Sequence, residues 1–179
     1  MCKAGIKIIQ YREKHKSIKE KLIECREIRK ITKDYGVIFI VNDHLEIAML
    51  SDACGLHLGQ DDLDICDARK LIPNMIIGKS THSISDAEKA VIDGADYIGV
   101  GPIYKTNTKD REPVGLEYLS YAVKNIKIPF IAIGGIKEHN LEEIVSYGAE
   151  RISLVSDIVE SKNIVEKINS LKNIIMKGN

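Results

Sequence analysis

The sequence predicts an α/β fold of the eight-stranded β/α-barrel (TIM) type, with seven strands countable in 179 residues. Three observations predict it. First, short runs rich in Ile and Val alternate with longer amphipathic stretches. Second, two similar segments, "GAD" at 94–96 and "GAE" at 148–150, are predicted to join helices to strands. Polar residues also follow the runs at the same end of every unit. An open doubly wound sheet is the alternative, but that recurrence favours the barrel.

The predicted strands are short and rich in β-branched residues, as are strands buried on both faces of a parallel sheet. They are residues 6–10, 37–41, 55–58, 75–80, 97–101, 128–134 and 151–155. Since the barrel has eight strands, we expect 1–179 to be a single domain that lacks its first β/α unit. An upstream start, a second copy or partner that fills the gap, and an inactive remnant are the three explanations left open.

Amphipathic stretches between the runs predict helices. Residues 83–94 begin at Ser83 as a helix N-cap and end at Gly94, and residues 139–148 repeat this design with Asn140 and Gly148. Residues 17–36 end at Gly36, and their apolar stripe consists of Ile18, Leu22, Cys25, Ile28 and Ile31.

Composition excludes several classes of protein. The 26 basic and 26 acidic residues give a formal net charge of zero, so we expect no general attraction to nucleic acid or to acidic membranes. No apolar run approaches the ~20 residues that span a bilayer, and the start does not resemble a signal peptide. The four cysteines form no CxxC pair. We therefore expect a cytoplasmic protein with free thiols.

The residues after the first three runs predict a diphosphate site. Arg12 and Lys14 suit a polyphosphate, with solvated charges at a strand end as the alternative. Asp43 and Asp62 follow neighbouring strands and fit a Mg²⁺ ion that bridges phosphate oxygens, whereas helix N-capping is the alternative role.

The later loops predict a second anion site. The segment 101–109 combines hydroxyls with lysines, and the strand-to-helix joints at Gly135 and Ser156 favour a phosphate. No Ser–His–Asp or Cys–His pair has the context of a nucleophile. Two anionic sites in one barrel mouth predict the joining of two phosphorylated molecules.

Several motifs in order resemble the thiamine phosphate synthase family, from residue 5 to about residue 158. They are "QYREK", "VND", "GLHLGQDD", "GKSTHS", "DYIGVGPIYKTNTK", "PVGLE", "IPFIAIGGI" and "LVSDI". The resemblance implies a transferase of thiamine biosynthesis that couples hydroxymethylpyrimidine diphosphate to a thiazole phosphate carboxylate. Thiamine phosphate, pyrophosphate and carbon dioxide are the products.

The resemblance also implies roles for individual residues. The metal ligands for Mg²⁺ would be Asp43 and Asp62, and the catalytic residues would be Arg12, Lys14, Ser80 and Lys109. Substrate binding would involve Gln10, Tyr11, Arg12, Glu13, Lys14, Asn42, Ser80, Thr106, Asn107, Thr108, Lys109, Gly135, Val155 and Ser156.

Two other functions remain open at this point. Thiazole tautomerase shares the fold and a segment like "STHS", but the intact "GQDD" run favours the synthase. A non-catalytic binder of thiazole phosphate is the second alternative, because the barrel is incomplete. Lys105 stands where the family usually has proline. We expect small-molecule substrates as partners, no nucleic acid and no membrane, with a homo-oligomer left open.

Overall fold

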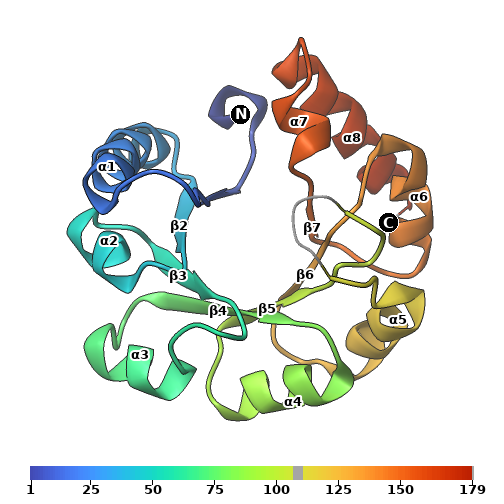
Figure 1. Ribbon diagram of the computed structural model, residues 1–179. Helices are drawn as coiled ribbons and strands as arrows, with labels where there is room; N and C mark the ends of the chain where they lie inside the picture. Colours follow the sequence, from blue (N-terminus) through green and yellow to red (C-terminus); the bar gives the residue numbers. More distant parts are fainter. Residues whose placement is uncertain (107–110, 179) are drawn as a thin grey trace. The chain divides into compact units, whose positions relative to one another are not determined.

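The computed structural model of the protein describes residues 1–106 and 111–178. Its fold is α/β, and the seven strands follow the order β1 to β7 in the sheet (Figure 1). This confirms the predicted fold class of a β/α-barrel type with seven countable strands. The chain separates into two compact units, Met1–Lys79 with Asp93–Asp96, and Ser80–Ile92 with Tyr97–Asn179.

Strands and helices alternate along the described residues. In order, the elements are a 3₁₀ helix η1 (Cys2–Ala4), β1 (Ile8–Tyr11), α1 (Ile18–Asp34), β2 (Ile38–Asn42), α2 (Leu45–Leu50), β3 (Gly55–Leu58), α3 (Ile65–Leu71), β4 (Ile76–Thr81), α4 (Ile84–Ile92), β5 (Tyr97–Val100), α5 (Gly115–Asn125), β6 (Phe130–Ile133), α6 (Glu138–Ser146), β7 (Ile152–Ser153), α7 (Ser156–Val159) and α8 (Ile164–Gly178).

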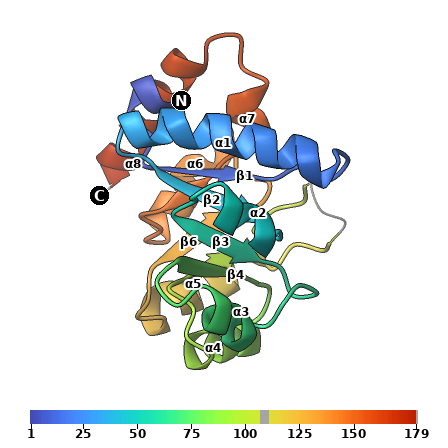
Figure 2. The ribbon, with the colours of Figure 1, turned by 90° about the vertical axis from the view of Figure 1, so that its left-hand side faces the viewer.

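In the first unit, β1, β2, β3 and the start of β4 pair in parallel. Asn42 pairs with His57, and Leu58 pairs with Lys79, so the carboxyl ends of neighbouring strands lie in register. Helix α1 packs against β2 and α2 (Figure 2). The core of this unit consists of fully buried residues such as Phe39, Val41, Leu56 and Ile77.

In the second unit, β5, β6 and β7 pair in parallel. Helix α5 packs against β5, and α6 packs against α8 (Figure 1). Fully buried residues such as Ile98, Leu119, Leu141 and Ile144 form its core.

The helix ends confirm one sequence prediction and correct another. Ser83 acts as the predicted cap of α4, because its Oγ accepts a hydrogen bond from the backbone N–H of Asp86 over 3.1 Å. Asn140 was predicted at the start of α6, but the helix begins at Glu138. Asn140 lies in its first turn and accepts a hydrogen bond from the N–H of Lys137 over 2.8 Å.

The predicted apolar stripe of α1 is wrong at its ends. Ile18 and Ile31 are exposed, whereas Cys25 and Lys21 are buried. The Lys21 Nζ lies 2.9 Å from Nε2 of His44, which precedes α2. This polar contact lets the helix bury a lysine stem where the pattern placed only apolar side chains.

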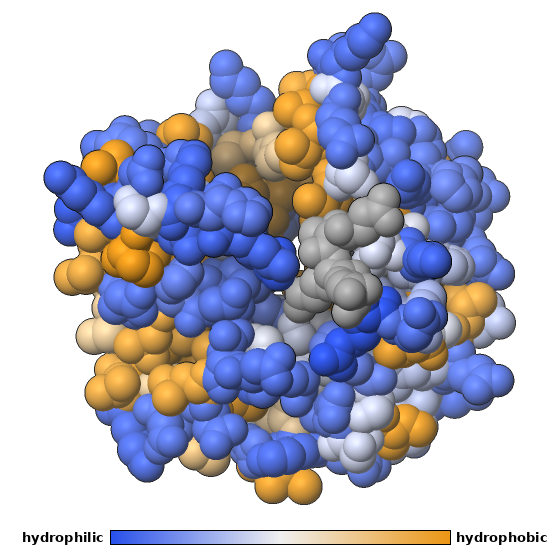
Figure 3. Space-filling model, in the orientation of Figure 1, coloured by the Kyte–Doolittle hydropathy of each residue, from blue (hydrophilic) through white to orange (hydrophobic). Residues whose placement is uncertain are grey.

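Surface hydropathy varies between the elements. Apolar residues gather over α7 in Figure 3, where Val159 and the preceding Val155 are exposed. No helix among residues 1–106 and 111–178 has both the length and the apolar character needed to traverse a bilayer.

Candidate functional site

The end of β1 is tied to α1 by a tyrosine. Tyr11 donates a hydrogen bond from its Oη to Oε2 of Glu24 over 2.7 Å, and Lys16 pairs with the same carboxylate. Burial and the Glu24 carboxylate raise the pKa of Tyr11. Ser17 and Glu20 then form a capping box that starts α1. The segment between β1 and α1 is therefore anchored at both ends.

Arg12 lies inside this anchored segment. Its Nε is buried and has no hydrogen-bond partner among the described residues. A buried guanidinium N–H without an acceptor is costly, so an anion at this point would satisfy it. Because β1 ends at Tyr11, Arg12 and Lys14 lie beyond the strand. Gln10 and Lys14 are exposed.

Glu13 has a local partner of its own. Its carboxylate accepts a hydrogen bond from the backbone N–H of His15 over 2.7 Å. This hydrogen bond lowers the pKa of Glu13 below its ordinary value.

Two polar residues follow each other at the end of β2. Asn42 is buried, and Asp43 is exposed. Asp43 has a left-handed backbone with φ of 64°, and its N–H donates to the carbonyl of His57 over 2.9 Å. A non-glycine residue in this conformation is uncommon and recurs at binding sites.

The turn after β3 holds the second aspartate. Oδ2 of Asp62 accepts a hydrogen bond from the N–H of Gly59 over 2.6 Å. The carbonyl of Gly59 accepts hydrogen bonds from Nζ of Lys79 over 2.8 Å and from the N–H of Asp62 over 3.4 Å. Asp62 therefore belongs to a turn in which the N–H and the carbonyl of its first residue, Gly59, are both hydrogen-bonded.

Asp43 and Asp62 follow the paired strands β2 and β3 within one unit. No group of three or more His, Cys, Asp or Glu side chains in the described part of the chain is arranged to hold a metal ion. Mg²⁺ commonly takes only one or two carboxylates, with waters and substrate oxygens completing its shell. The donor set of two carboxylates fits that ion.

In the second unit, Ser80 is buried near the end of β4. The next residue, Thr81, donates a hydrogen bond to the carbonyl of Gly99 over 2.9 Å and lies 2.5 Å from Oη of Tyr118 on α5. Burial raises the pKa of Tyr118 to about 12. Since successive side chains alternate, Thr81 faces α5 and Ser80 faces the opposite side of the strand.

The segment after β5 packs closely against the glycines after β6. The N–H of Tyr104 donates to the carbonyl of Gly134 over 3.0 Å. A Cβ at Gly135 would lie 2.6 Å from the carbonyl oxygen of Lys105, and its φ is 66°. Only glycine fits there, so this close approach explains the predicted glycine without a ligand.

Thr106 is half-buried, at the end of the described part of this loop. The predicted residues Asn107, Thr108 and Lys109 lie outside the described residues.

A polar pocket of about 270 Å³ adjoins the predicted Ser156. Lys167 crosses it to contact Glu138 at 2.7 Å and Asp157 at 3.3 Å. Lys137 also lines the pocket and forms no ion pair within the described ranges. The pocket's remaining lining residues are Glu160 and Ser161, while the predicted Val155 is exposed beside it.

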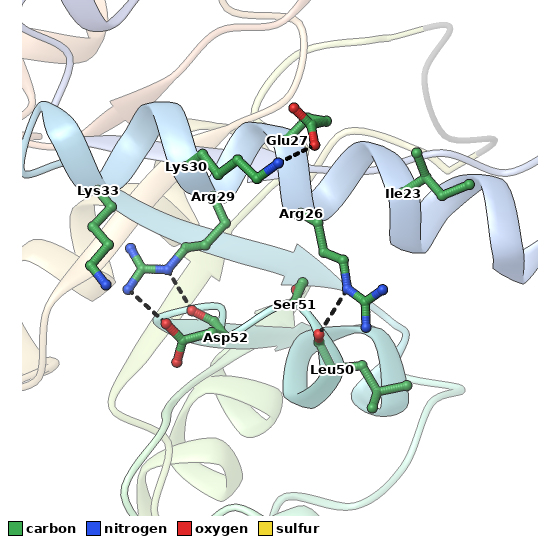
Figure 4. Close-up of a pocket in the computed structure, with 9 residues that line it drawn as sticks. All are labelled: Ile23, Arg26, Glu27, Arg29, Lys30, Lys33, Leu50, Ser51 and Asp52. Carbon is green, nitrogen blue, oxygen red and sulfur yellow. Dashed lines mark hydrogen bonds and ion pairs between the residues drawn. The ribbon is translucent and has the colours of Figure 1, made fainter.

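A second pocket, of about 470 Å³, lies on the outside of α1 (Figure 4). Arg26 donates to the carbonyl of Leu50, and Arg29 donates to that of Asp52. The arginines thus satisfy carbonyls at the end of α2, which explains the basic lining by helix capping. None of the predicted site residues lines this pocket.

Sequence reasoning missed Lys79 and Glu24. The position of Lys79 inside the apolar run 75–80 was the signal that could have identified it. Glu24 lies on the helix and carried no signal, because its contact with Tyr11 depends on how α1 packs.

Comparison with known proteins identifies the family. The family described as thiamine monophosphate synthase matches residues 1–158. The chain belongs to the thiamine monophosphate synthase family. The thiamine-phosphate synthase of Pelotomaculum thermopropionicum is 54% identical and is matched over 99% of this chain and 83% of its own length. That of Caldicellulosiruptor saccharolyticus is 52% identical, over 98% of this chain and 80% of its own.

A solved structure agrees with this family assignment. The thiamine phosphate pyrophosphorylase of Pyrococcus furiosus has a TM-score of 0.93 and 33% identity, covering 99% of this chain and 86% of that one. The predicted family and its transferase activity, thiamine phosphate synthesis, are thereby confirmed. The roles predicted for individual residues remain predictions.

Proposed function

We propose that this chain joins hydroxymethylpyrimidine diphosphate to thiazole phosphate in thiamine biosynthesis. The carbon–oxygen bond to the diphosphate breaks, and its electron pair leaves with pyrophosphate. The thiazole nitrogen then donates its lone pair to the pyrimidine carbon, and the carboxylated thiazole also loses carbon dioxide. The protein's proposed ligands are these two small molecules, and its proposed location is the cytoplasm.

The observation that carries the diphosphate site is the buried Nε of Arg12, which has no acceptor among the described residues. A diphosphate oxygen would accept this hydrogen bond and pair with the guanidinium charge. Gln10, Lys14 and Asn42 are the proposed neighbours of that ligand. Tyr11 and Glu13 act through the segment that holds Arg12, since both have partners within it or on α1.

Asp43 and Asp62 are the proposed ligands of Mg²⁺. When bound, the ion would neutralise negative charge on the departing diphosphate. The protein's contribution is to present the two carboxylates from adjacent strand ends, one by the left-handed backbone of Asp43 and the other by the turn at Gly59.

The second unit supplies the proposed thiazole phosphate site. Gly135, Val155 and Ser156 would hold the phosphate, and Lys137, which lines the pocket beside Ser156 and forms no ion pair within the described ranges, supports this. Thr106 and the loop residues Asn107, Thr108 and Lys109 are proposed to contact both ligands. Ser80 is proposed to contact the diphosphate or the pyrimidine, because it lies on the face of β4 opposite Thr81.

The chemistry requires charge neutralisation and positioning more than a protein nucleophile. The test is to incubate the purified chain with both precursors and Mg²⁺, and to identify thiamine phosphate by mass spectrometry. Product that requires both precursors supports the proposal. Isomerisation of thiazole phosphate alone would indicate the tautomerase, and binding of thiazole phosphate without any product would indicate a non-catalytic binder.

A further inference from the structure

Lys79 is an unusual residue for the buried part of a strand, because it is a lysine within β4. Its side chain is 8% exposed, and no acidic partner lies within ion-pair distance in the described ranges. It shares a face of β4 with Thr81 and lies opposite Ser80, because side chains alternate along a strand. Burying an ammonium group in this way is costly unless the group has a specific polar partner.

That partner is the carbonyl of Gly59, which accepts a hydrogen bond from Nζ of Lys79 over 2.8 Å. The N–H of the same residue donates to Oδ2 of Asp62 over 2.6 Å. Gly59 is therefore held from two directions, by a lysine on β4 and by an aspartate three residues further along the turn.

The turn also leaves little room around the aspartate. A Cβ at Gly59 would lie 2.9 Å from Oδ2 of Asp62. A shift of the Gly59 backbone would therefore displace Oδ2 of Asp62. Since Oδ2 is used inside the turn, Oδ1 is the oxygen that remains for a cation.

We infer that Lys79 is a positioning residue, which holds the backbone of Gly59 through its carbonyl and thereby aims the carboxylate of Asp62 that the N–H of the same residue binds. The inference rests on the proposed role of Asp62 as a Mg²⁺ ligand. Groups that orient a metal ligand without touching the metal commonly change metal affinity 10–100-fold when they are replaced, by rough estimate. Lys79 would act in this way through one backbone carbonyl.

The test measures binding of Mn²⁺ in the presence of inorganic pyrophosphate, followed by electron paramagnetic resonance. Lys79→Met keeps the volume of the stem but removes the ammonium group. We expect it to bind Mn²⁺ about tenfold more weakly than the unchanged protein. Lys79→Arg, which keeps a donor, should recover part of the affinity. Lys70→Met on α3, an exposed lysine paired with Asp67, is the matched control and should bind normally.

Two further variants keep the inference testable. Gly59→Ala should also weaken Mn²⁺ binding, because it displaces Asp62 while Lys79 stays intact, and it serves if Lys79→Met does not fold. Asp62→Asn tests the proposed function itself. Weaker binding in Asp62→Asn with unchanged binding in Lys79→Met overturns only the positioning role. Unchanged binding in Asp62→Asn overturns the ligand role, and the inference falls with it.

Discussion

Tyr11, the last residue of β1, donates a hydrogen bond to Glu24 of α1 over 2.7 Å. This contact fixes the start of the segment that contains Arg12. Tyr11→Phe keeps the ring and removes the bond, so we expect unfolding in urea to become easier by about 0.5–1.5 kcal/mol. Pyrophosphate binding, measured by calorimetry, should also weaken because the Arg12 segment loses an anchor.

The matched control for Tyr11 is Tyr121 on α5, whose phenol donates a hydrogen bond to Glu88 of α4 over the same 2.7 Å. Because the Tyr121 hydrogen bond is exposed, Tyr121→Phe should cost less stability than Tyr11→Phe and leave pyrophosphate binding unchanged. Equal pyrophosphate affinity in the two variants would show that the Tyr11 contact stabilises the fold and does not contribute to pyrophosphate binding.

Replacing Arg12 should separate stability from binding. Arg12→Met removes a buried donor that has no acceptor among the described residues, so we expect equal or higher stability in urea. Pyrophosphate affinity should fall about 10–100-fold, the equivalent of one charge-assisted hydrogen bond of about 1.5–3 kcal/mol. Arg26→Met, at the outer pocket, should not change that affinity. A large loss of stability in Arg12→Met would mean that the guanidinium supports the fold instead.

Asp43 and Asp52 form a natural matched pair. Both have left-handed backbones, with φ of 64° and 56°, and both are exposed. Asparagine tolerates this conformation, so Asp→Asn at either position should leave the fold intact. We expect only Asp43→Asn to raise the Mg²⁺ concentration needed for half-maximal activity, by at least tenfold in order of magnitude. An equal Mg²⁺ requirement in the two variants would remove Asp43 from the metal site.

Gly135 should tolerate no side chain. Gly135→Ala meets both a positive φ of 66° and a carbonyl oxygen at 2.6 Å, whereas Gly115→Ala has a φ of 73° and open space around it. The control should lose about 1–2 kcal/mol for its backbone alone. Gly135→Ala should lose more than this, by urea unfolding. Equal losses would show that the loops after β5 and β6 can separate freely.

Tyr118 predicts a loss of stability at high pH. Burial raises its pKa from 10.0 to about 12, so the unfolded chain releases the phenolic proton first. Stability from this group is therefore complete below pH 10 and declines as the pH rises from 10 to about 12. The slope is at most about 1.4 kcal/mol per pH unit for one group. Tyr118→Phe should reduce the decline in urea unfolding between pH 9 and 11, while an unchanged slope would contradict this assignment.

Strand positions and the fold class could be predicted from the sequence because buried parallel strands form compact runs of Ile and Val. All seven predicted runs overlap strands of the structure. Helix capping could be predicted where the two hydrogen-bonded residues are close in the sequence, as are Ser83 and Asp86. The buried face of α1 could not be predicted in full, because the buried Lys21 contacts His44, which lies 23 residues further along the chain.

The residue types of the candidate site could be predicted from the sequence, but the contacts that hold those residues in place could not. Arg12, Asp43 and Asp62 follow from charge at strand ends. The contacts Tyr11–Glu24 and Lys79–Gly59 join residues 13 and 20 positions apart, and they depend on how neighbouring elements pack. Composition and periodicity do not encode such contacts.

The most direct test of the account is pyrophosphate release by the purified chain. Both phosphorylated precursors would be supplied, first with Mg²⁺ and then with a chelator. We expect pyrophosphate to be released in an amount equal to the thiamine phosphate formed, to require both precursors, and to stop when the chelator is added. Release that continues with the chelator, or with Asp43 and Asp62 both replaced by Asn, would contradict the proposed diphosphate and Mg²⁺ site.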